Sequence, residues 1–277
     1  MIKKILRKPS GLFSLVFILL MLLVAITGPL WVPYGVNEVD ISKMFLAPSS
    51  EHLFGTDELG RDILTRVVLA SGVSIQVSIA SVAIALTLGA AAGMLSGYFG
   101  RWADAILMRV VDVMFAFPVL LLALAVVAIL GPGVNTVIIA IAVVYTPIFA
   151  RIARSATVAV VQQPYIKASQ VTGARASRIL LQHVLPNIAA PLIVQTSVSL
   201  AFAILSEAAL SFLGLGAQPP DPTWGRMLFD AKGYLVQAWW MAVLPGIVVL
   251  LTVLSFNLLG DSLRDALDTS TQRGDDD

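Results

Sequence analysis

The titratable side chains in or near the apolar stretches of this sequence offer little catalytic chemistry. The two histidines, His52 and His183, stand far apart and form no H-E-x-x-H or His-rich metal motif. Gly260-Asp261 lacks a second aspartate within an apolar stretch, so no aspartyl-protease dyad is expected. The chain has no cysteine and no G-x-x-x-x-G-K-[ST] phosphate loop. We therefore expect no enzymatic activity, metal or cofactor within this chain.

One acidic side chain, Glu207, lies deep in an apolar stretch. Exposing such a group to lipid is costly, so it should face protein or a water-filled cavity. It belongs to a series of small or polar residues at helical spacing, which comprises Gln195, Ser199, Ala203, Glu207, Ser211 and Gly214. Two roles stay open for Glu207, a structural hydrogen-bonding partner or a lining of a substrate passage. The candidates for the passage are Gln195, Ser199, Glu207 and Ser211.

Other polar groups favour structural roles. Asp112 follows Arg109 by three residues, a spacing that predicts an ion pair on one helix face. Small residues recur every three or four positions at Ser74, Ser78, Ser81, Ala85, Gly89, Ala92 and Ser96. Such a series predicts a seam along which two membrane helices pack closely. Pro118 and Pro147 permit kinks in their helices.

The segment 162–187, QQPYIKASQVTGARASRILLQHVLPN, is a polar unit in an otherwise apolar region. Pro164 suits the first turn of a helix that should run to Thr172, and Gly173 can adopt the left-handed conformation that ends it. A second helix is expected over Ala176–Leu185, ending at Pro186. On pattern alone, the unit is either an ordinary positively charged surface loop or a helical elbow that a soluble partner grips.

Composition places these features in a membrane protein. Hydrophobic residues make up 58% of the 277 residues and charged residues 13%, against about 45–50% and about 25% in soluble domains. Six apolar stretches are long enough to cross the ~30 Å hydrocarbon layer as helices. They are Gly11–Trp31, Val73–Tyr98, Ala105–Leu130, Val134–Ala150, Ile188–Leu213 and Trp240–Leu259. The expected fold class is an all-α membrane protein with six transmembrane helices.

The distribution of basic residues predicts the orientation of these spans. With the N-terminus in the cytosol, most of the 18 lysines and arginines are cytosolic, as the positive-inside rule requires. These are Lys3, Lys4, Arg7, Lys8, Arg101, Arg109, Arg151, Arg154, Lys167, Arg175, Arg178, Arg264 and Arg273. Both termini and the segment 162–187, between spans four and five, are then cytosolic. The net charge of +1 favours no nucleic-acid partner.

The connections divide the chain into three parts. Residues 1–72 hold the first span and an extracytosolic segment, residues 73–265 hold a core of five spans with the loop 162–187, and residues 266–277 form a cytosolic tail. Within 32–72, a short helix capped by Thr56 or Asp57 is expected to lie on the outer membrane surface, with docking of an external protein as the alternative. The connection 214–238 contains three prolines and predicts a rigid turn at the outer mouth rather than a ligand site.

Three groups of residues resemble one family of transport proteins. Tyr165, Ala168, Gly173, Arg178, His183 and Leu185-Pro186-Asn187 are similar in spacing to the "EAA" coupling motif of bacterial ATP-binding-cassette importer permeases, although Lys167-Ala168-Ser169 replaces its Glu-Ala-Ala. The stretches His52–Asp62, Glu207–Gly216 with Gln218-Pro219-Pro220 and Trp224-Gly225, and Gly260–Asp268 resemble the C-type permease subunit of dipeptide, oligopeptide and nickel importers.

The resemblance implies a permease subunit in the bacterial inner membrane that forms half of a translocation pathway. Its implied partners are a second homologous permease subunit, two ATPase subunits that bind ATP and Mg²⁺, and an extracytosolic substrate-binding protein. The residues implied to couple to the ATPases are Tyr165, Ile166, Ala168, Ser169, Thr172, Gly173 and Ala174. Di- and oligopeptides are the first substrate class, and nickel or nickel chelates are the alternative. A secondary transporter that works without ATPases is the alternative from another class.

Overall fold

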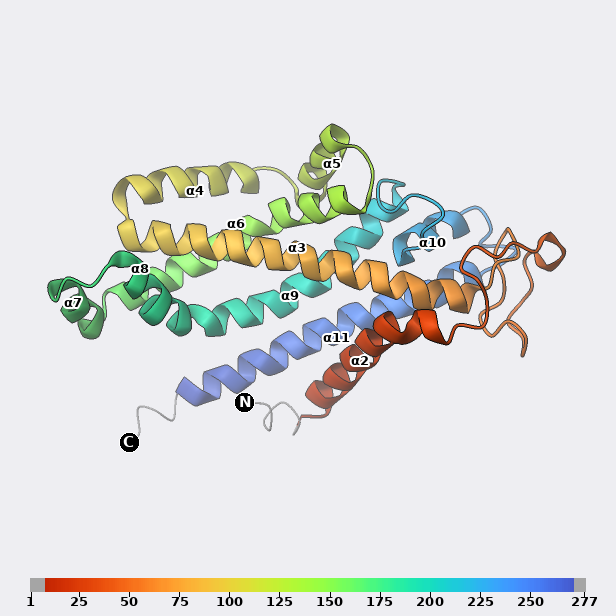
Figure 1. Ribbon diagram of the computed structural model, residues 1–277, viewed down its shortest axis with the longest axis horizontal. Coiled ribbons are helices and arrows are strands. Elements are labelled where there is room, and N and C mark those ends of the chain that lie inside the picture. The colour runs from red at the N-terminus through yellow and green to blue at the C-terminus, as the bar shows by residue number, and fades with distance from the viewer. Residues whose placement is uncertain (1–7, 272–277) are drawn as a thin grey trace.

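The computed structural model describes residues 8–271, and this part of the chain is a bundle of long helices without a named strand (Figure 1). Five unbroken helices are long and apolar enough to cross a membrane, and there are six spans if one sharply bent pair counts as one. The predicted all-α membrane class is confirmed. Four of the basic residues used for the orientation, Lys3, Lys4, Arg7 and Arg273, lie outside the described residues.

The helices follow one another as α2 (Pro9–Thr27), α3 (Ile63–Phe99), α4 (Arg101–Phe115), α5 (Val119–Leu130), α6 (Val134–Val161), α7 (Pro164–Val171), α8 (Ala176–Ile179), α9 (Leu185–Phe212), α10 (Trp224–Ala231) and α11 (Trp240–Thr271). Short 3-10 turns, η1 (Gly28–Leu30) and η2 (Ile41–Lys43), and a π-helical turn, η3 (Leu180–Val184), complete the order. Helix α11 continues past Asp265 into the first residues of the predicted tail.

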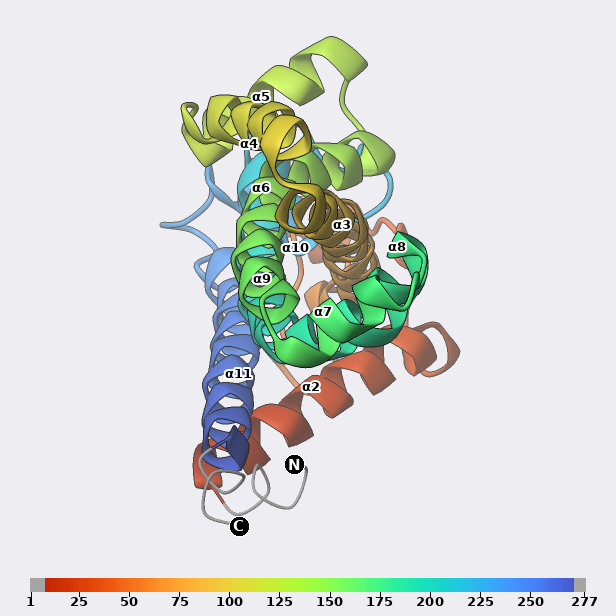
Figure 2. The same cartoon turned by 90° about the vertical axis from the view of Figure 1, so that its left-hand side faces the viewer.

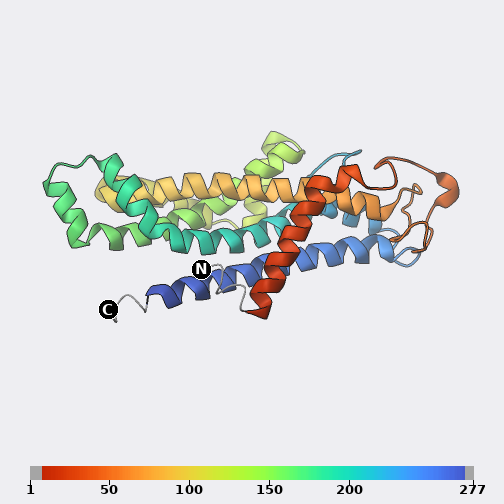
Figure 3. The same cartoon turned by 60° about the horizontal axis from the view of Figure 1, so that its bottom comes forward.

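The long helices α3, α6 and α9 run side by side along the molecule (Figures 1 and 2). One apolar core lies among α3, α5, α6 and α9, and a second lies among α2, α3, α9, α10 and α11. Helix α2 crosses α11 at the edge of the bundle (Figure 3). Lys8, just before α2, forms a 2.6 Å ion pair with Asp265 near the C-terminal end of α11. Helices α7 and α8 lie at one end of the bundle, which we call the α7 end, and α10 lies near the other, the α10 end.

Helix α3 corrects the prediction of a separate surface helix in the segment 32–72. It begins at Ile63 and continues without a break to Phe99, and its N-cap is Asp62, whose carboxylate accepts the Thr65 N–H at 2.7 Å. Neither Thr56 nor Asp57 caps it. The polar-to-apolar transition near Val73 marks no helix boundary, because Gly72 alone does not stop a helix. The helix therefore extends beyond the predicted second span toward the α10 end.

Close backbone packing joins α3 to α6. A Cβ atom added to Gly89 would lie 2.5 Å from the Thr146 carbonyl oxygen, and one added to Gly93 would lie 2.3 Å from the Ala150 carbonyl oxygen. Ser74, Ser78, Ser81, Ala85 and Ser96 are also buried. The predicted packing seam on this helix is confirmed, and small side chains let the two backbones approach as is usual in membranes.

The predicted third span is two helices. α4 and α5 meet at 95°, and Pro118 is the N-cap of α5. Proline disfavours a helical conformation in the preceding residue and has no N–H to donate, so a break at this point is expected. Pro147, in contrast, lies buried inside an uninterrupted α6.

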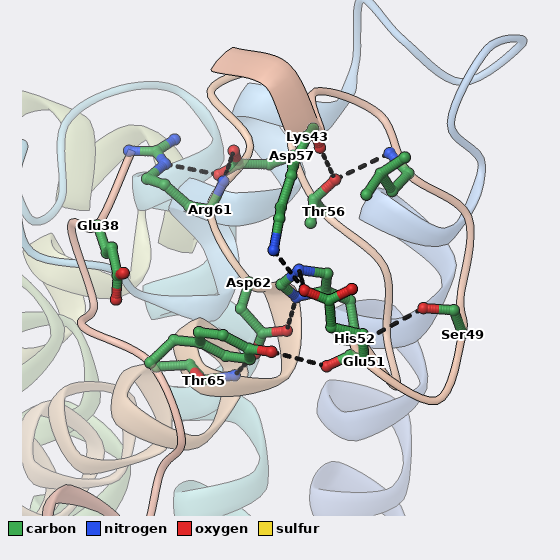
Figure 4. Close-up of polar contacts among 12 residues, drawn as sticks. Glu38, Lys43, Ser49, Glu51, His52, Thr56, Asp57, Arg61, Asp62 and Thr65 are labelled. Atoms are coloured by element: carbon green, nitrogen blue, oxygen red, sulfur yellow. Dashed lines mark hydrogen bonds and ion pairs between the residues drawn. The ribbon is translucent and has the colours of Figure 1, made fainter. Parts of the chain in front are cut away.

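The segment between α2 and α3 folds over the α10 end through a compact set of polar contacts (Figure 4). His52 is buried, its Nδ1 lies 2.9 Å from Asp62 Oδ1, and its ring packs on Tyr34 with centroids 4.8 Å apart. Thr56 Oγ1 donates to the Lys43 carbonyl and accepts the Leu46 N–H. The segment between α2 and α3 is therefore a folded cap that orders the start of α3.

Replacing Gly93 by leucine should disrupt the α3–α6 seam, because the new side chain would collide with backbone that cannot move aside. We expect the folded subunit to lose about 1–3 kcal/mol, a typical cost of overpacking. Thermal unfolding in detergent measures this, and Ala91→Leu, which places a leucine on the exposed side of α3, is the control. Equal melting temperatures for the two variants would contradict the seam.

Removing the carboxylate of Asp62 should loosen the start of α3. Asp62→Ala leaves the Thr65 N–H without its cap, which costs about 1 kcal/mol, and leaves His52 Nδ1 without its partner. Asp62→Asn keeps a capping oxygen and should lose less stability. Asp40→Ala, which uncaps only the exposed turn η2, is the control. Thermal unfolding that ranks Asp40→Ala as the more damaging change would refute the role of Asp62.

Candidate coupling and transport sites

The first half of the helical elbow predicted at 162–187 has the geometry that the sequence indicates. α7 has Pro164 at its first position and ends at Val171. Gly173 has a φ of +78° and donates its N–H to Gln170 O, while the Ala174 N–H bonds to Ser169 O at 3.1 Å. These two bonds form a Schellman cap, which satisfies the last carbonyls of the helix. Glycine is favoured at the left-handed position because it has no Cβ.

Only one side chain of α7, Ile166, is fully buried, and it belongs to the core shared with α3, α6 and α9. Tyr165, Ala168, Thr172 and Gly173 are exposed, and Ser169 and Ala174 are partly exposed. The seven residues predicted for ATPase coupling therefore lie together at one end of the molecule, six of them accessible to a partner. Their role in coupling stays a prediction.

The second half of the elbow differs from the prediction. α8 covers only Ala176–Ile179, continues through the π-helical turn η3, and leads into α9 without stopping at Pro186. Proline is tolerated there because it lies in the first turn of α9. Single π-helical turns often occur at functional sites. Beside α8 and η3 lies an open depression of about 600 Å³, which is lined by Gly173, Ala174, Arg175, Ser177, Arg178, Leu181 and Gln182.

Two ion pairs tie α4 to α6 near the α7 end. Arg154 forms a two-pronged pair with Asp104, in which Nη2 lies 2.6 Å from Oδ2, and Ser96 of α3 donates to the same carboxylate. Arg151 pairs with Asp112 at 2.8 Å. The predicted pair of Asp112 with Arg109 is therefore wrong, because α6 brings a closer cation to it. A two-pronged arginine–carboxylate pair fixes direction as well as distance.

The polar series on α9 lies inside the subunit. Gln195 Nε2 donates to Ser199 Oγ at 3.1 Å, and Ser199 and Ser211 are both buried. Glu207 is 1% exposed, and its Oε1 accepts the Ser211 hydroxyl at 2.7 Å. The series faces neighbouring helices of the same chain, which is the placement expected for a polar group kept from lipid.

Glu207 sits where α3, α9 and α10 meet. The hydroxyls of Ser74 and Thr223 face its carboxyl, and Ser74 Oγ also accepts the Trp224 N–H. Trp224 is fully buried and donates its indole N–H to Val67 O at 3.1 Å. Helix α10 itself was not predicted within the connection 214–238, although Thr223, which accepts the Arg226 N–H, is a readable N-cap signal.

The α10 end carries a second, charged cavity of about 180 Å³. Its lining includes Glu58, Arg61, Arg66, Arg226 and Asp230, from the segment before α3, from α3 itself and from α10. Burial raises the pKa of the Glu58 and Asp230 carboxyls above their usual range. Arg61 bonds to both Asp57 and Glu58, so most of these charges are paired within the chain.

Comparisons with known proteins agree with this architecture. The family model described as the binding-protein-dependent transport system inner membrane component matches residues 85–273. The model of the N-terminal TM domain of oligopeptide transport permease C matches residues 1–48. The second match covers α2 and the start of the polar cap, and the first covers most of the helical bundle with the elbow.

Curated relatives match nearly the whole chain. The dipeptide transport system permease protein DppC of Alkalihalophilus pseudofirmus is 44% identical over 266 residues, covering 96% of this chain and 88% of the relative. The di/tripeptide permease DppC of Pseudomonas aeruginosa is 45% identical, covering 94% and 88%. The glutathione transport system permease protein GsiD of Pectobacterium atrosepticum is 42% identical, covering 96% and 89%.

Among solved structures, an inward-facing conformation of the MetNI methionine ABC transporter resembles this chain with a TM-score of 0.59 and 18% identity, covering 74% of this chain and 97% of the other. At that identity the similarity concerns the fold alone. Together with the family models and the curated relatives, these findings show that the chain belongs to the binding-protein-dependent transport system inner membrane components, as a multi-pass, C-type permease subunit of an ATP-binding-cassette importer.

Proposed function

We propose that this permease subunit forms half of the passage of an importer for dipeptides and other short peptides. The names of the relatives support this substrate class, since they are dipeptide, di/tripeptide and glutathione permeases at 42–45% identity. The observation that carries the coupling function is the exposed helix α7, which is capped at Gly173 and fixed to the bundle by the buried Ile166.

The proposed partners follow from the family and from the two ends of the bundle. One of the two ATPase subunits contacts α7 and the depression beside it, and a second homologous permease subunit, which engages the other ATPase, completes the passage within the bilayer. An extracytosolic binding protein delivers substrate at the α10 end, where the folded cap and the charged cavity are. The α7 end is cytosolic in this arrangement, together with the two ends of the described chain.

Force from the ATPases has a short route into the bundle. Only Gln162 and Gln163 separate α7 from α6, so a displaced α7 pulls directly on α6. Arg151 and Arg154 connect α6 to α4, and α4 leads to the sharp bend before α5. A movement of the elbow thus shifts α6 and α4 together and changes the angle at which α5 stands.

The part of Gln195, Ser199, Glu207 and Ser211 in the passage remains a proposal. All four side chains form hydrogen bonds within the subunit, Gln195 with Ser199 and Ser211 with Glu207. They reach a substrate only if α9 separates from α3 and α10 during the transport cycle. The acidic group of Glu207 supports the proposal, because ionisable side chains within membrane spans are rare and often mark a substrate pathway.

A bulky charge on the exposed face of α7 should uncouple the importer. For Ala168→Arg, we expect the subunit to insert normally, because Ala168 is exposed, while co-purification of the ATPase subunits falls about ten-fold, equivalent to ~1.4 kcal/mol. ATP-dependent uptake of Ala-Ala into proteoliposomes should fall with it.

The control for the co-purification is Ser50→Arg, which adds the same charge on an exposed residue at the opposite end and should leave ATPase binding unchanged. Uptake of Ni²⁺ in place of Ala-Ala by the unchanged assembly would replace the peptide assignment with the nickel alternative. Normal ATPase binding and normal uptake by Ala168→Arg would overturn the coupling role of α7.

The orientation can be measured directly, because the chain contains no cysteine. Gln170→Cys on α7 and Ser50→Cys in the cap each introduce one exposed thiol. A membrane-impermeant maleimide added to intact cells, with the outer membrane permeabilised where one is present, should label Ser50→Cys alone. Gln170→Cys should react only after the inner membrane is opened. The reverse pattern would place α7 outside the cell and exclude ATPase coupling.

A further inference from the structure

A small cavity between α5, α6 and α9 plays no part in the sites described so far. It has a volume of about 190 Å³ and is lined mainly by aliphatic side chains of the three helices, with Ala123 on α5 and Ala209 on α9. It is open on one side, where Leu120 and Leu205 are exposed. Helix α5 stands beside the outer half of α6 and forms one wall (Figure 1). No charged residue lines it.

Two hydroxyl groups meet in this otherwise apolar cavity. Tyr145 of α6 is 6% exposed, and its hydroxyl lies 3.1 Å from Ser206 Oγ of α9. Tyr145 is roughly 16 Å along α6 from Val134, at 1.5 Å per residue, which is about halfway through the ~30 Å hydrocarbon layer. Either hydroxyl can donate to the other, so the pair has both a donor and an acceptor to offer to a third group.

The cavity is on a different side of α9 from the buried polar series. Ser206 and Glu207 are neighbours in the chain and are therefore separated by about 100° around the helix. Glu207 faces α3 and α10, whereas Ser206, Leu205 and Ala209 face α5 and α6. The face that already has room for a substrate group is thus not the face that the polar series suggested.

We infer that this cavity receives one uncharged, apolar side chain of the transported peptide, and that the Tyr145–Ser206 pair bonds to the adjoining peptide group. This assignment rests on the proposed function and specifies its substrate contact. The volume is below the ~300 Å³ of ordinary small-molecule sites, so it holds a single side chain rather than a whole peptide. The absence of charge in the lining favours an uncharged occupant, because burying a charge without a partner is costly.

Movement of α5, which forms one wall of the cavity, would release the bound side chain. Among the named helices, α5 packs mainly on α6, and it joins α4 through the 95° bend. The ion pairs of Arg151 and Arg154 connect α4 to the part of α6 that precedes α7. A displacement of α7 therefore reaches the wall of this cavity, so that ATP-driven motion opens and closes the place where the side chain lies.

The test is Ala209→Leu, which fills the cavity from α9. It uses the assembled importer in proteoliposomes at a saturating concentration of the loaded binding protein, so that the maximal uptake rate reports on the permease rather than on delivery. We expect the rate for Ala-Phe to fall about ten-fold, the effect of removing room for a few carbon atoms from an apolar pocket, while the rate for Ala-Ala changes less than about two-fold.

Two further variants separate the possible outcomes. Ala125→Leu adds the same atoms to the exposed side of α5 and should leave both rates unchanged. Tyr145→Phe removes only a hydroxyl and should lower the rates for both peptides. Equal effects of Ala209→Leu on Ala-Phe and Ala-Ala, or none on either, would assign the cavity to lipid or to packing and overturn the inference. An unchanged assembly that takes up neither peptide would instead overturn the proposed function, and the inference with it.

Discussion

The close contact between the backbones of α3 and α6 is the constraint on which the rest of this subunit depends. Lipid provides no hydrophobic gain for bringing two membrane helices together, so their association depends on packing. Gly89 and Gly93 let the carbonyls of α6 approach to distances that no side chain permits. Because α6 leads directly into α7, this seam fixes the support from which the elbow projects. The sharp bend between α4 and α5 and the cavity beside α5 are both positioned relative to α6.

Much of this arrangement was predictable from local signals. Long apolar stretches define the spans, and Pro164 and Gly173 mark the two ends of α7 within a few residues. The contacts between distant segments were not predictable. Asp104 and Arg154 are 50 residues apart, and nothing in either neighbourhood indicates the other. The sequence predicted an ion pair between Asp112 and Arg109, because spacing reveals only pairs on the same helix. The observed partner, Arg151, comes from another helix.

The treatment of Glu207 shows the same limit. Its apolar surroundings predict a buried carboxyl, but its neighbours Ser74 and Thr223 come from α3 and from the residue before α10, a helix that the proline-rich connection concealed. The start of α3 was misplaced for a related reason. Asp62 has two partners, Thr65 nearby and His52 on the folded cap, and only the first can be anticipated from a capping pattern. Where tertiary contacts select among several capping residues, local preference does not decide.

Helix α7 is attached to the bundle mainly through Ile166, and its other side chains are largely exposed. This exposure bears on which ATPases could bind the subunit. The surface that it presents carries Tyr165, Lys167, Gln170 and Val171 around Ala168, and it is separated by the length of the bundle from the folded cap before α3. In the proposed coupling role, the ATPases would recognise side chains that lie far from the cavities at the α10 end and beside α5, so this recognition would carry no information about the cargo. Under that proposal, one pair of ATPases would be compatible with several permeases that move different solutes, provided that each displays an elbow of the same form.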